Sequence, residues 1–298
     1  MTNDKVIAGL IVTFNPDIPR LKKNIDALKK NIGNNFLVVD NGSNNIDEII
    51  NIVQNNHILR FPNNLGIAKA QNEGFKRLLK DKYKWIILLD QDSILPLNAC
   101  DVICSTKEFS EDLTGIIGVS IRKDLPKRGV VEESQLISSG CFVRAEAWIK
   151  SGGMDEYLFI DFVDLDFDSR VLLAGYKLYE ETDVVMEHEI GKTIYAPTLG
   201  KLLRLSYREG YFFDHSPIRI FYFYRNSIIV QKRYPNLFHV NYNLTFKYLK
   251  RTREIFAYKK PRMKKFFYAL KGISEGRKYS PKRDKEFQSI LEQIYEKN

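Results

Sequence analysis

The first ninety residues of the chain alternate between unbroken apolar runs and stretches of helical periodicity. The apolar runs lie near residues 6–14, 35–40, 57–61 and 84–90. Between the first two, Leu21, Ile25 and Leu28 recur at helical spacing, with lysines on the opposite side. Runs that are apolar on both faces are typical of strands in a parallel sheet, and the intervening pattern is typical of crossover helices. The pattern predicts an α/β fold of the doubly wound, Rossmann-like kind, with a mostly parallel sheet flanked by helices.

Polar residues follow three of these predicted strands. Thr13 and Asn15 follow the first strand, Asp40 the second, and Asp90 and Asp92 the fourth. Ligands of open α/β sheets bind at the carboxyl ends of strands, so these are candidate site residues. On residue type alone, Asp90 and Asp92 fit a divalent-cation site and a turn cap equally well. The chain contains neither GxGxxG nor GxxxxGK[ST], which argues against a dinucleotide enzyme and a P-loop ATPase.

Three further apolar runs predict additional strands beyond Pro96. They lie at residues 115–120, 136–143 and 184–187. Gly140 falls inside the second run, where a glycine often marks a bulge or the approach of a ligand. His188 follows the third run and is the histidine most suited to a chemical role, although a histidine in such a place is more often structural than a ligand.

An acidic cluster lies between the last two of these runs. Asp161, Asp164, Asp166 and Asp168 occur within eight residues, at the start of a helix predicted over residues 164–174. The N-terminus of a helix favours carboxylates, so helix capping is one interpretation of Asp164 or Asp166. Four acids exceed what capping requires, and catalysis is the other interpretation.

Composition indicates a folded protein without a membrane crossing. The chain has 298 residues, of which 44% are hydrophobic and 12% aromatic, enough for a substantial core. No run approaches the roughly 20 apolar residues that a membrane crossing needs. The three cysteines, Cys100, Cys104 and Cys141, match neither CxxC nor metal-finger spacing, and no secretory leader follows Met1. We expect a cytoplasmic protein with reduced cysteines in packing roles.

Charge is unevenly distributed along the chain. Residues 201–298 contain 23 Lys and Arg against 8 Asp and Glu, a net charge of +15, whereas residues 1–200 contain 23 against 29, a net charge of −6. We predict a catalytic domain over residues 1–200. Residues 201–298 are predicted to form a basic, amphipathic helical region, with helices near 244–258 and 263–273.

The basic region favours an anionic membrane surface as its partner. Aromatic residues are interleaved with Lys and Arg in it, as in helices that bind at membrane interfaces. Helices that pack on the body with solvated lysines are the alternative, and we expect no nucleic-acid binding because no RNP, KH or zinc-finger signature is present. The aromatic residues 221–224, if exposed, leave room for a homodimer.

The motifs of residues 5 to about 230, in their order and spacing, resemble those of family 2 inverting glycosyltransferases with the GT-A fold. More narrowly, they resemble the bacterial rhamnosyltransferase-like branch of that family. The motifs are Val-Thr-Phe-Asn at 12–15, Val-Asp-Asn-Gly-Ser at 39–43, Asn-Asn-Leu-Gly-Ile-Ala at 63–68 with Asn72 and Gly74, Leu-Asp-Gln-Asp at 89–92, Ser-Gly at 139–140, Phe-Ile-Asp-Phe-Val-Asp at 159–164 with Arg170, His188 with Gly191, and the stretch 217–226.

The resemblance implies that residues at the ends of the early strands bind a nucleotide-sugar donor. These residues are Thr13, Asn15, Asp40, Asn41, Asn64, Gly66, Asp90 and Gln91. Within this set, Asp40 is expected to contact the base or ribose, and Asn64 with Gly66 to shape the diphosphate side.

The resemblance also implies a metal site and a catalytic base. Asp90-Gln91-Asp92 matches the DxD motif of the family, which binds Mg²⁺ or Mn²⁺, with Asp92 as the more direct ligand. His188 lies near a histidine that completes the metal site in some relatives. Asp164, six residues before Arg170, aligns with the catalytic base of the family.

We therefore expect a metal-dependent inverting glycosyltransferase. The resemblance favours transfer of L-rhamnose from dTDP-rhamnose to a lipid-linked or polysaccharide acceptor in bacterial cell-surface glycan synthesis, by an enzyme peripheral on the inner face of the membrane. The alternatives are a hexosyltransferase that uses a UDP-sugar and, from another class, a non-catalytic scaffold on the membrane surface. A sugar nucleotidyltransferase would need a GxGxR-like first loop, which residues 13–16 do not provide.

Overall fold

The chain divides into two compact units. The computed structural model describes residues 6–122, 126, 128–188, 193–195, 211–237 and 244–296. The first unit comprises Met1–Phe159, Val163–Glu189 and Ser289–Asn298, and the second comprises Ile160–Phe162 and Ile190–Gln288. The domain boundary predicted at residue 200 lies outside the described residues.

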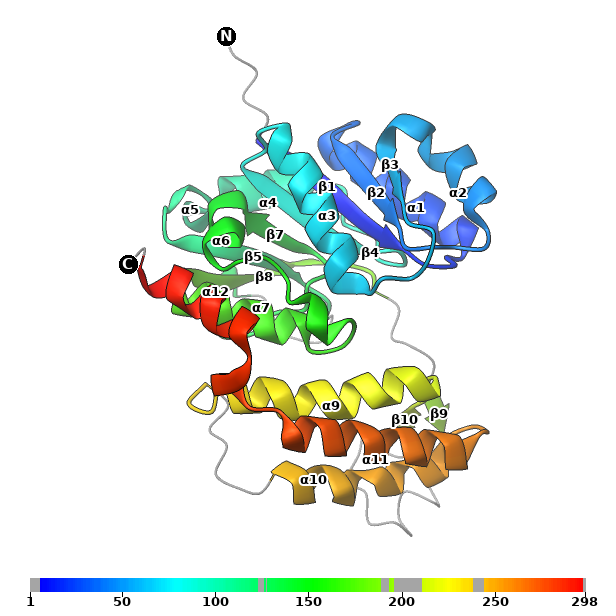
Figure 1. Cartoon of the computed structure of the whole chain (residues 1–298). Helices are drawn as coiled ribbons and strands as arrows, with labels where there is room; N and C mark the ends of the chain where they lie inside the picture. Colours follow the sequence, from blue (N-terminus) through cyan, green and yellow to red (C-terminus); the bar gives the residue numbers. More distant parts are fainter. Residues whose placement is uncertain are drawn as a thin grey trace. The chain divides into compact units, whose positions relative to one another are not determined.

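The first unit is built on a single eight-stranded sheet. Its strands are β1 (Ile7–Thr13), β2 (Phe36–Asp40), β3 (Ile58–Arg60), β4 (Trp85–Asp90), β5 (Thr114–Ser120), β6 (Val130–Glu133), β7 (Cys141–Arg144) and β8 (Lys177–Val185). Their order is β3-β2-β1-β4-β7-β5-β8-β6 (Figure 1). Strands β1 to β4 pair in parallel, as do β5 and β8, whereas β7 and β6 pair antiparallel to their neighbours. The predicted mostly parallel sheet is confirmed.

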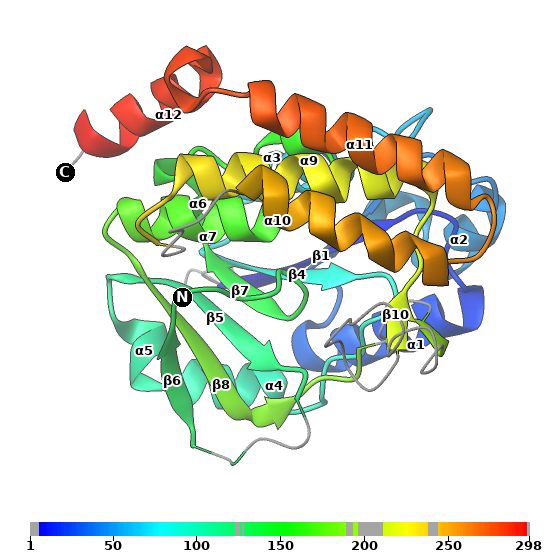
Figure 2. The ribbon, with the colours of Figure 1, turned by 90° about the horizontal axis from the view of Figure 1, so that it is seen from below.

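Helices cover both faces of this sheet (Figure 2). One face carries α1 (Ile18–Ile32), α2 (Ile46–Val53), α4 (Ala99–Ser105) and α5 (Lys107–Ser110). The other face carries α3 (Ile67–Lys80), α6 (Ala145–Lys150) and α7 (Val163–Leu173). Two short 3₁₀ helices, η1 (Asn55–His57) and η2 (Glu156–Leu158), lie in the connections.

Alternation along the strands fills both helix–sheet interfaces. Ile11 of β1 and its register partner Leu89 of β4 join the buried cluster under α1, α2 and α4. On the opposite face, Trp148 of α6 stacks on Phe75 of α3, with ring centroids 3.6 Å apart. Gly74 allows α3 to approach the sheet closely, because a Cβ there would lie 2.4 Å from the side chain of Leu10. The small residue at position 74 thus serves helix–sheet packing.

The structure differs from the predicted strand over residues 136–143. Strand β7 begins only at Cys141, because Gly140 adopts a left-handed conformation with φ of 87° that breaks the strand. The N–H of Gly140 donates a hydrogen bond of 2.8 Å to the carbonyl oxygen of Leu88. Cys141 and Cys100 are buried as predicted, and burial raises the pKa of the Cys100 thiol to about 12, but Cys104 is exposed. The prediction of a packing role is therefore wrong for Cys104.

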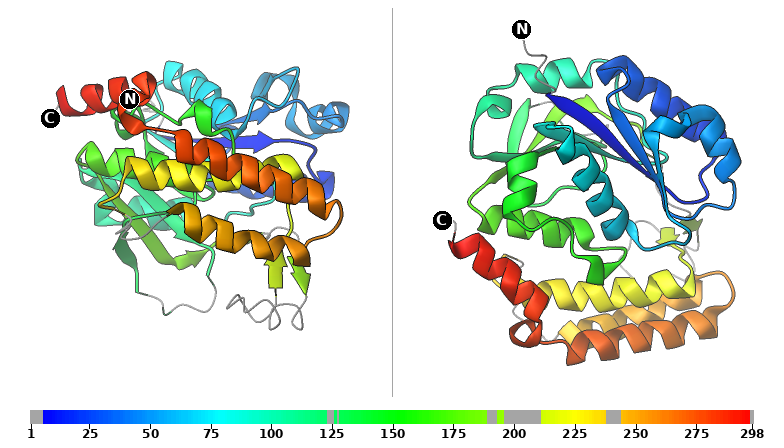
Figure 3. Two further views of the ribbon diagram at one scale, coloured as in Figure 1. Left: turned by 60° about the horizontal axis from the view of Figure 1, so that its bottom comes forward. Right: turned by 45° about the horizontal axis from the view of Figure 1, so that its top comes forward.

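The second unit is mainly helical. It contains the antiparallel strands β9 (Thr193–Tyr195) and β10 (Tyr211–Phe213), the helices α9 (Pro217–Arg233), α10 (Leu244–Arg251) and α11 (Arg262–Lys278), and the 3₁₀ helices η4 (Thr252–Ala257) and η5 (Pro281–Arg283). Helix α12 (Lys285–Glu296) begins in this unit and continues into the first. Helices α9, α10 and α11 lie side by side (Figure 3). The helices predicted near residues 244–258 and 263–273 are present, the first as α10 followed by η4.

The aromatic residues of α9 pack inside the second unit. Tyr224 belongs to a buried cluster with Tyr248 of α10 and Ile273 of α11, and Phe223 packs against this cluster. Phe221 is also buried. The premise that residues 221–224 are exposed is therefore wrong, and they give no ground for a homodimer. Among the described residues, no helix combines the length and apolar character that a membrane crossing requires.

Candidate functional site

The candidate site lies at the carboxyl edge of the parallel strands in the first unit. Register pairs Thr13 at the end of β1 with Asp40 at the end of β2. On the other side of β1, Val12 pairs with Asp90 at the end of β4. The three polar strand ends that the sequence singled out therefore lie next to one another, as expected for neighbouring parallel strands.

The carboxylate of Asp40 organises the turn after β2. Its Oδ1 accepts a 3.0 Å hydrogen bond from the Thr13 hydroxyl, and its Oδ2 accepts from the N–H groups of Gly42 and Ser43. Only 1% of Asp40 is exposed. The same turn holds Asn15, whose N–H donates to the hydroxyl of Ser43 at 2.8 Å. Asp40 thus shapes the edge on which Asn15 is presented.

Asn41 ties this turn to the loop that precedes α3. Its Nδ2 donates to the Oδ1 of Asn64 and to the carbonyl of Gly66, both at 3.1 Å, and its Oδ1 accepts from the N–H of Leu65. Gly66 has φ of 92°, and a Cβ there would lie 2.7 Å from the ring of Phe159. The N–H of the next residue, Ile67, donates to the carbonyl of Phe159 at 2.8 Å. The structure therefore brings Asn41, Asn64 and Gly66 together and anchors residue 159 to them.

Asp90, Asp92 and His188 form a cluster with the chemistry of a metal site. One ligand atom from each of the three side chains lies within 4.8 Å of the others. An isolated bridge between Ile94 and Glu187, with backbone N to O distances of 2.8 and 3.1 Å, brings His188 next to the turn after β4. Two carboxylates and an imidazole fit a divalent cation. Gly191, the last residue of this predicted motif, lies outside the described residues.

Hydrogen bonds fix the orientation of the histidine. The Nδ1 of His188 lies 2.9 Å from the hydroxyl of Ser93, which lies 2.7 Å from the hydroxyl of Ser139. The Ser139 hydroxyl in turn accepts from the N–H of Asp90 at 2.9 Å. Because Ser93 engages Nδ1, the Nε2 of His188 is the ring nitrogen left to bind a cation.

Two residues of α1 that the sequence reasoning missed hold the turn after β4. The Nδ2 of Asn24 donates to the carbonyl of Asp90, and the Nε of Arg20 donates to the carbonyl of Asp92, both at 2.7 Å. Gln91 adds a third contact, because its Oε1 accepts from the N–H of Phe14 at 2.8 Å. A signal was present in the sequence: Asn24 is a polar residue on the apolar side of α1, next to Ile25.

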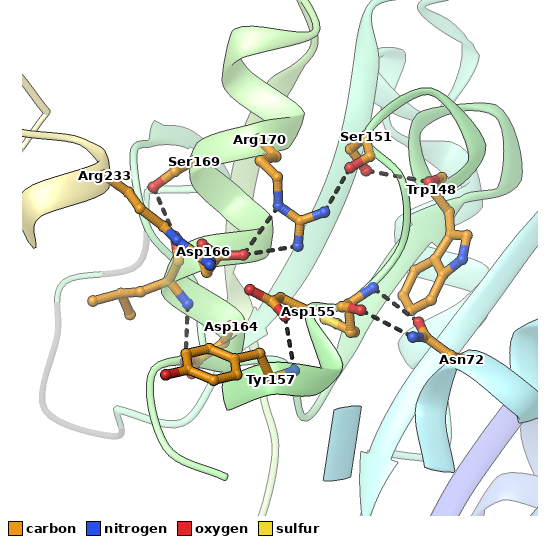
Figure 4. Close-up of polar contacts among 12 residues, drawn as sticks. Asn72, Trp148, Ser151, Asp155, Tyr157, Asp164, Asp166, Ser169, Arg170 and Arg233 are labelled. Carbon is orange, nitrogen blue, oxygen red and sulfur yellow. Dashed lines mark hydrogen bonds and ion pairs between the residues drawn. The ribbon is translucent and has the colours of Figure 1, made fainter. Parts of the chain in front are cut away.

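The acidic cluster separates into side chains with different roles (Figure 4). Asp166 is fully buried and accepts from the guanidinium of Arg170 at 2.8 and 3.0 Å, while Arg170 also donates to the carbonyl of Ser151. Asp168 accepts from the N–H of Leu136 at 2.7 Å, and burial raises the pKa of its carboxyl well above 3.8. These two aspartates hold α7 in the core of the first unit.

Asp164 differs from its two neighbours in α7. It is half-buried in the first turn of the helix, and its Oδ1 accepts from the N–H of Leu165. The chain before α7 is anchored to α3, since Asn72 exchanges hydrogen bonds of 2.8 and 2.9 Å with the backbone of Met154 (Figure 4). Asp164 is thus the partly accessible carboxylate at the start of a firmly held helix.

Similarity to known proteins is consistent with this arrangement. Residues 10–129 match the family model "Glycosyl transferase family 2". The chain is 29% identical over 249 residues to a protein of Shigella flexneri described as "dTDP-rhamnosyl transferase RfbF", covering 76% of this chain and 80% of that protein.

Solved structures share the fold at low sequence identity. A structure of GalNAc-T7 with UDP, GalNAc and Mn²⁺ has a TM-score of 0.54 at 14% identity, covering 99% of this chain and 57% of the other. A structure of TarS 1–349 from S. aureus in complex with UDP-GlcNAc has a TM-score of 0.51 at 12% identity, covering 98% of this chain and 92% of the other. The chain therefore has the GT-A fold, its residues 10–129 match the model of glycosyltransferase family 2, and it is similar to a rhamnosyltransferase.

Proposed function

We propose that this glycosyltransferase transfers L-rhamnose from dTDP-rhamnose, with inversion and with the help of a divalent cation. The acceptor proposed is a lipid-linked saccharide or polysaccharide of the bacterial cell surface. The observation that carries the proposal is the cluster of Asp90, Asp92 and His188 at the carboxyl edge of the sheet. The choice of donor rests on the likeness to a dTDP-rhamnosyl transferase.

The donor is proposed to lie along the ends of β1, β2 and β4. The residues proposed to border it are Thr13, Asn15, Asp40, Asn41, Asn64, Gly66, Asp90 and Gln91. Support comes from the hydrogen bonds that join the turns after these strands, such as that from Phe14 to Gln91. These bonds give a preformed edge, which lowers the cost of ordering the site when the nucleotide binds.

Asp90, Asp92 and His188 would hold Mg²⁺ or Mn²⁺. The oxygen-rich donor set suits either ion, and the imidazole favours Mn²⁺ over Mg²⁺. A cation bound there stabilises negative charge on the departing diphosphate. Ser93 keeps the imidazole of His188 in one orientation, and the α1 residues Arg20 and Asn24 keep the backbone of the two aspartates in place.

Asp164 is proposed as the general base. A single displacement at the anomeric carbon needs one carboxylate to take the proton of the acceptor hydroxyl as the new bond forms, and such assistance is worth about 10²- to 10⁴-fold in rate. Asp166 is fully buried in its pair with Arg170, and Asp168 is buried against Leu136. These contacts leave Asp164 as the acid of α7 best suited to meet an acceptor.

The second unit is proposed to bring the enzyme to an anionic membrane surface on the cytoplasmic side. Four large apolar side chains of its α10–α11 segment are exposed, namely Leu249, Phe256, Met263 and Phe267. Exposed lysines of the same segment include Lys250, Lys259, Lys260, Lys264 and Lys271. Exposed apolar residues among lysines are typical of surfaces that bind at a membrane interface. We name these nine residues the α10–α11 surface.

A nucleotide panel tests the donor site. A ligand that binds only the folded state at 100 times its Kd stabilises that state by about 2.7 kcal/mol, so the melting temperature reports binding. We expect the largest rise with dTDP plus Mn²⁺ and a smaller rise with dTDP alone, UDP or GDP. A larger rise with UDP would point to a UDP-sugar donor, and no rise with any nucleotide would favour a scaffold without catalysis.

A transfer assay then tests the reaction itself. Wild-type enzyme with dTDP-rhamnose, Mn²⁺ and a bacterial membrane lipid extract is expected to release dTDP, and Asp92→Ala is expected to abolish the release. The matched control is Asp101→Asn, which removes an exposed carboxylate from α4. Unchanged release by Asp92→Ala would overturn the assignment of the metal site.

A further inference from the structure

The segment Ile160–Phe162 is held by one face of α9 in the second unit. Arg219, Phe223 and Asn226 of α9 contact it, and their spacing of four and then three residues places them on a single side of the helix. Each of the three uses a different chemistry. A helix face that contacts three consecutive residues at three points restricts their backbone far more than a single contact does.

The first of the three contacts is an ion pair between Arg219 and Asp161. The guanidinium of Arg219 lies 2.9 to 3.2 Å from the two carboxylate oxygens of Asp161 through its Nε and an NH2 group. A two-nitrogen contact of this kind fixes the direction of the carboxylate as well as its distance. The Asp161 side chain is mostly buried, with 15% exposed, so the pair is only partly screened by solvent.

The second contact is made by the side-chain amide of Asn226, which bridges two backbone carbonyl groups. The Nδ2 of Asn226 donates to the backbone oxygens of Ile160 at 2.8 Å and of Asp161 at 2.9 Å. Asn226 is fully buried, and its Oδ1 accepts from the Nε of the neighbouring Arg225 at 2.9 Å. Because Arg225 can only donate, it fixes which end of the amide carries the NH₂ group. The third contact is between aromatic rings: the ring centroid of Phe162 lies 5.4 Å from that of Phe223.

The segment Ile160–Phe162 has a backbone conformation that an isolated peptide would rarely adopt. Asp161 and Phe162 have φ of 62° and 65°, in the left-handed region that residues other than glycine rarely adopt. Two such residues in succession persist only where the surroundings impose the conformation. The α9 contacts with the Asp161 carboxylate, its carbonyl and the Phe162 ring supply that constraint.

We propose that Asn226 and Arg219 are positioning residues for the general base. The chain passes from Phe162 directly into Val163 and Asp164, so the Cα of Phe162 lies no more than about 7 Å from that of Asp164. The conformation of the segment therefore sets how the chain enters the first turn of α7. This inference rests on the proposed role of Asp164, and it assigns α9 the task of holding the approach to that residue.

Asn226→Ala tests the inference against a matched control. The control is Gln231→Ala, which also removes two hydrogen bonds donated by a side-chain amide of α9, to Ser227 and Tyr248, but does not touch the segment. We expect Asn226→Ala to lower kcat for dTDP release about 10- to 100-fold, since small misplacements of a catalytic group have effects of this size. We expect both variants to bind dTDP with Mn²⁺ within about 2-fold of wild type.

Arg219 provides a second, less disruptive test, because 44% of its side chain is exposed. Arg219→Ala is expected to lower kcat, and Arg219→Lys to recover part of the loss, because lysine keeps the charge but not the two-nitrogen contact. The inference is overturned if Asn226→Ala loses no more kcat than Gln231→Ala. It is also overturned if the Arg219 variants lower dTDP affinity as much as kcat.

Failure of the inference can be told from failure of the proposed function. If Asp164→Asn is inactive while Asn226→Ala retains wild-type kcat, the base assignment stands and the positioning role is wrong. If Asp164→Asn retains wild-type kcat, the proposed base is wrong and with it the inference that depends on that base.

Discussion

The Nδ1 atom of His188 lies 2.9 Å from the hydroxyl oxygen of Ser93, and this contact leaves Nε2 as the ring nitrogen available to a cation in the cluster with Asp90 and Asp92. Ser93 is fully buried and also lies 2.7 Å from the Ser139 hydroxyl. A buried partner of this kind fixes the ring of a metal-binding histidine and its tautomer. Ser93 should therefore act on cation affinity without contacting the cation.

Ser93→Ala is expected to weaken Mn²⁺ binding about 10- to 100-fold, the usual effect of removing such a partner. The measurement is the Mn²⁺ concentration that gives half-maximal dTDP release, at saturating donor. Ser105→Ala is the matched control, since Ser105 is exposed and donates only to the carbonyl of Val102. Equal Mn²⁺ requirements in the two variants would show that Ser93 does not act on the metal site through His188.

Asp164 and Asp166 are two residues apart in α7 and should respond to the same substitution in opposite ways. Asp164→Asn is expected to lower kcat at least about 100-fold with little change in the free energy of unfolding, because it removes a base from a half-buried position. Asp166→Asn is expected to destabilise the first unit by about 3–5 kcal/mol, because it breaks a fully buried ion pair with Arg170.

Denaturant unfolding and steady-state kinetics on both variants check this contrast. A stability loss in Asp164→Asn as large as that in Asp166→Asn would mean that Asp164 is structural. An active Asp164→Asn enzyme would assign the proton transfer to another group.

The buried carboxyl of Asp168 predicts a pH dependence of stability. Burial raises its pKa in the folded state well above the usual value of 3.8. The folded state therefore holds a proton that the unfolded state has released, and stability falls as pH rises from about 4 toward the folded-state pKa. Asp168→Asn lacks this titratable group. The free energy of unfolding of the variant should therefore increase relative to that of wild type as pH rises. Unfolding in denaturant at several pH values between 4 and 8 measures the difference; a constant difference would mean that Asp168 is ionised in the folded protein.

We expect that Gly66 cannot accept a side chain, because of its backbone conformation and because of a steric clash. Its φ is 92°, and a Cβ would lie 2.7 Å from the ring of Phe159. Gly33 has φ of 64°, but a Cβ at that position would meet no atom within 4 Å, so Gly33→Ala carries the backbone penalty alone. We expect Gly33→Ala to cost about 1 kcal/mol of stability and Gly66→Ala about 1–3 kcal/mol more. Gly66→Ala should also weaken dTDP binding, measured by calorimetry, whereas Gly33→Ala should not.

The apolar runs and the polar residues after them predicted the sheet and its ligand-binding edge, because both depend on local sequence. Asp90 and Asp92 follow one strand and belong to one short motif, so spacing alone placed them together. His188 is brought to them by the bridge between Ile94 and Glu187, a pairing of residues ninety-three positions apart that no local pattern encodes. Its inclusion in the site came from a family resemblance.

Tertiary contacts also explain what the sequence missed or misjudged. Asn24 and Arg20 lie on a helix far from the DxD motif in the chain and act through backbone carbonyls. The position of Asn24 on the apolar side of α1 indicates a buried polar contact, but the sequence does not name its partner. The aromatic residues of α9 looked exposed because they lie in a sequence rich in Arg and Lys, with Arg219 and Arg225 on either side. In the structure α10 and α11 cover Tyr224, and Arg225 lies over the ring of Tyr222.

The α10–α11 surface predicts binding to anionic membranes. Met263 and Phe267 lie one helical turn apart on α11, are 63% and 61% exposed, and have Lys264 and Lys271 beside them in the helix. Apolar insertion combined with lysine attraction should give binding to vesicles that contain phosphatidylserine, and added salt should weaken it. Lys264→Glu with Lys271→Glu should reduce binding in a vesicle sedimentation assay more than the same charge change at Lys22 and Lys23, exposed lysines of α1 in the first unit. Equal binding to neutral vesicles, or an equal loss in both double variants, would argue that the lysines of this surface are merely solvated.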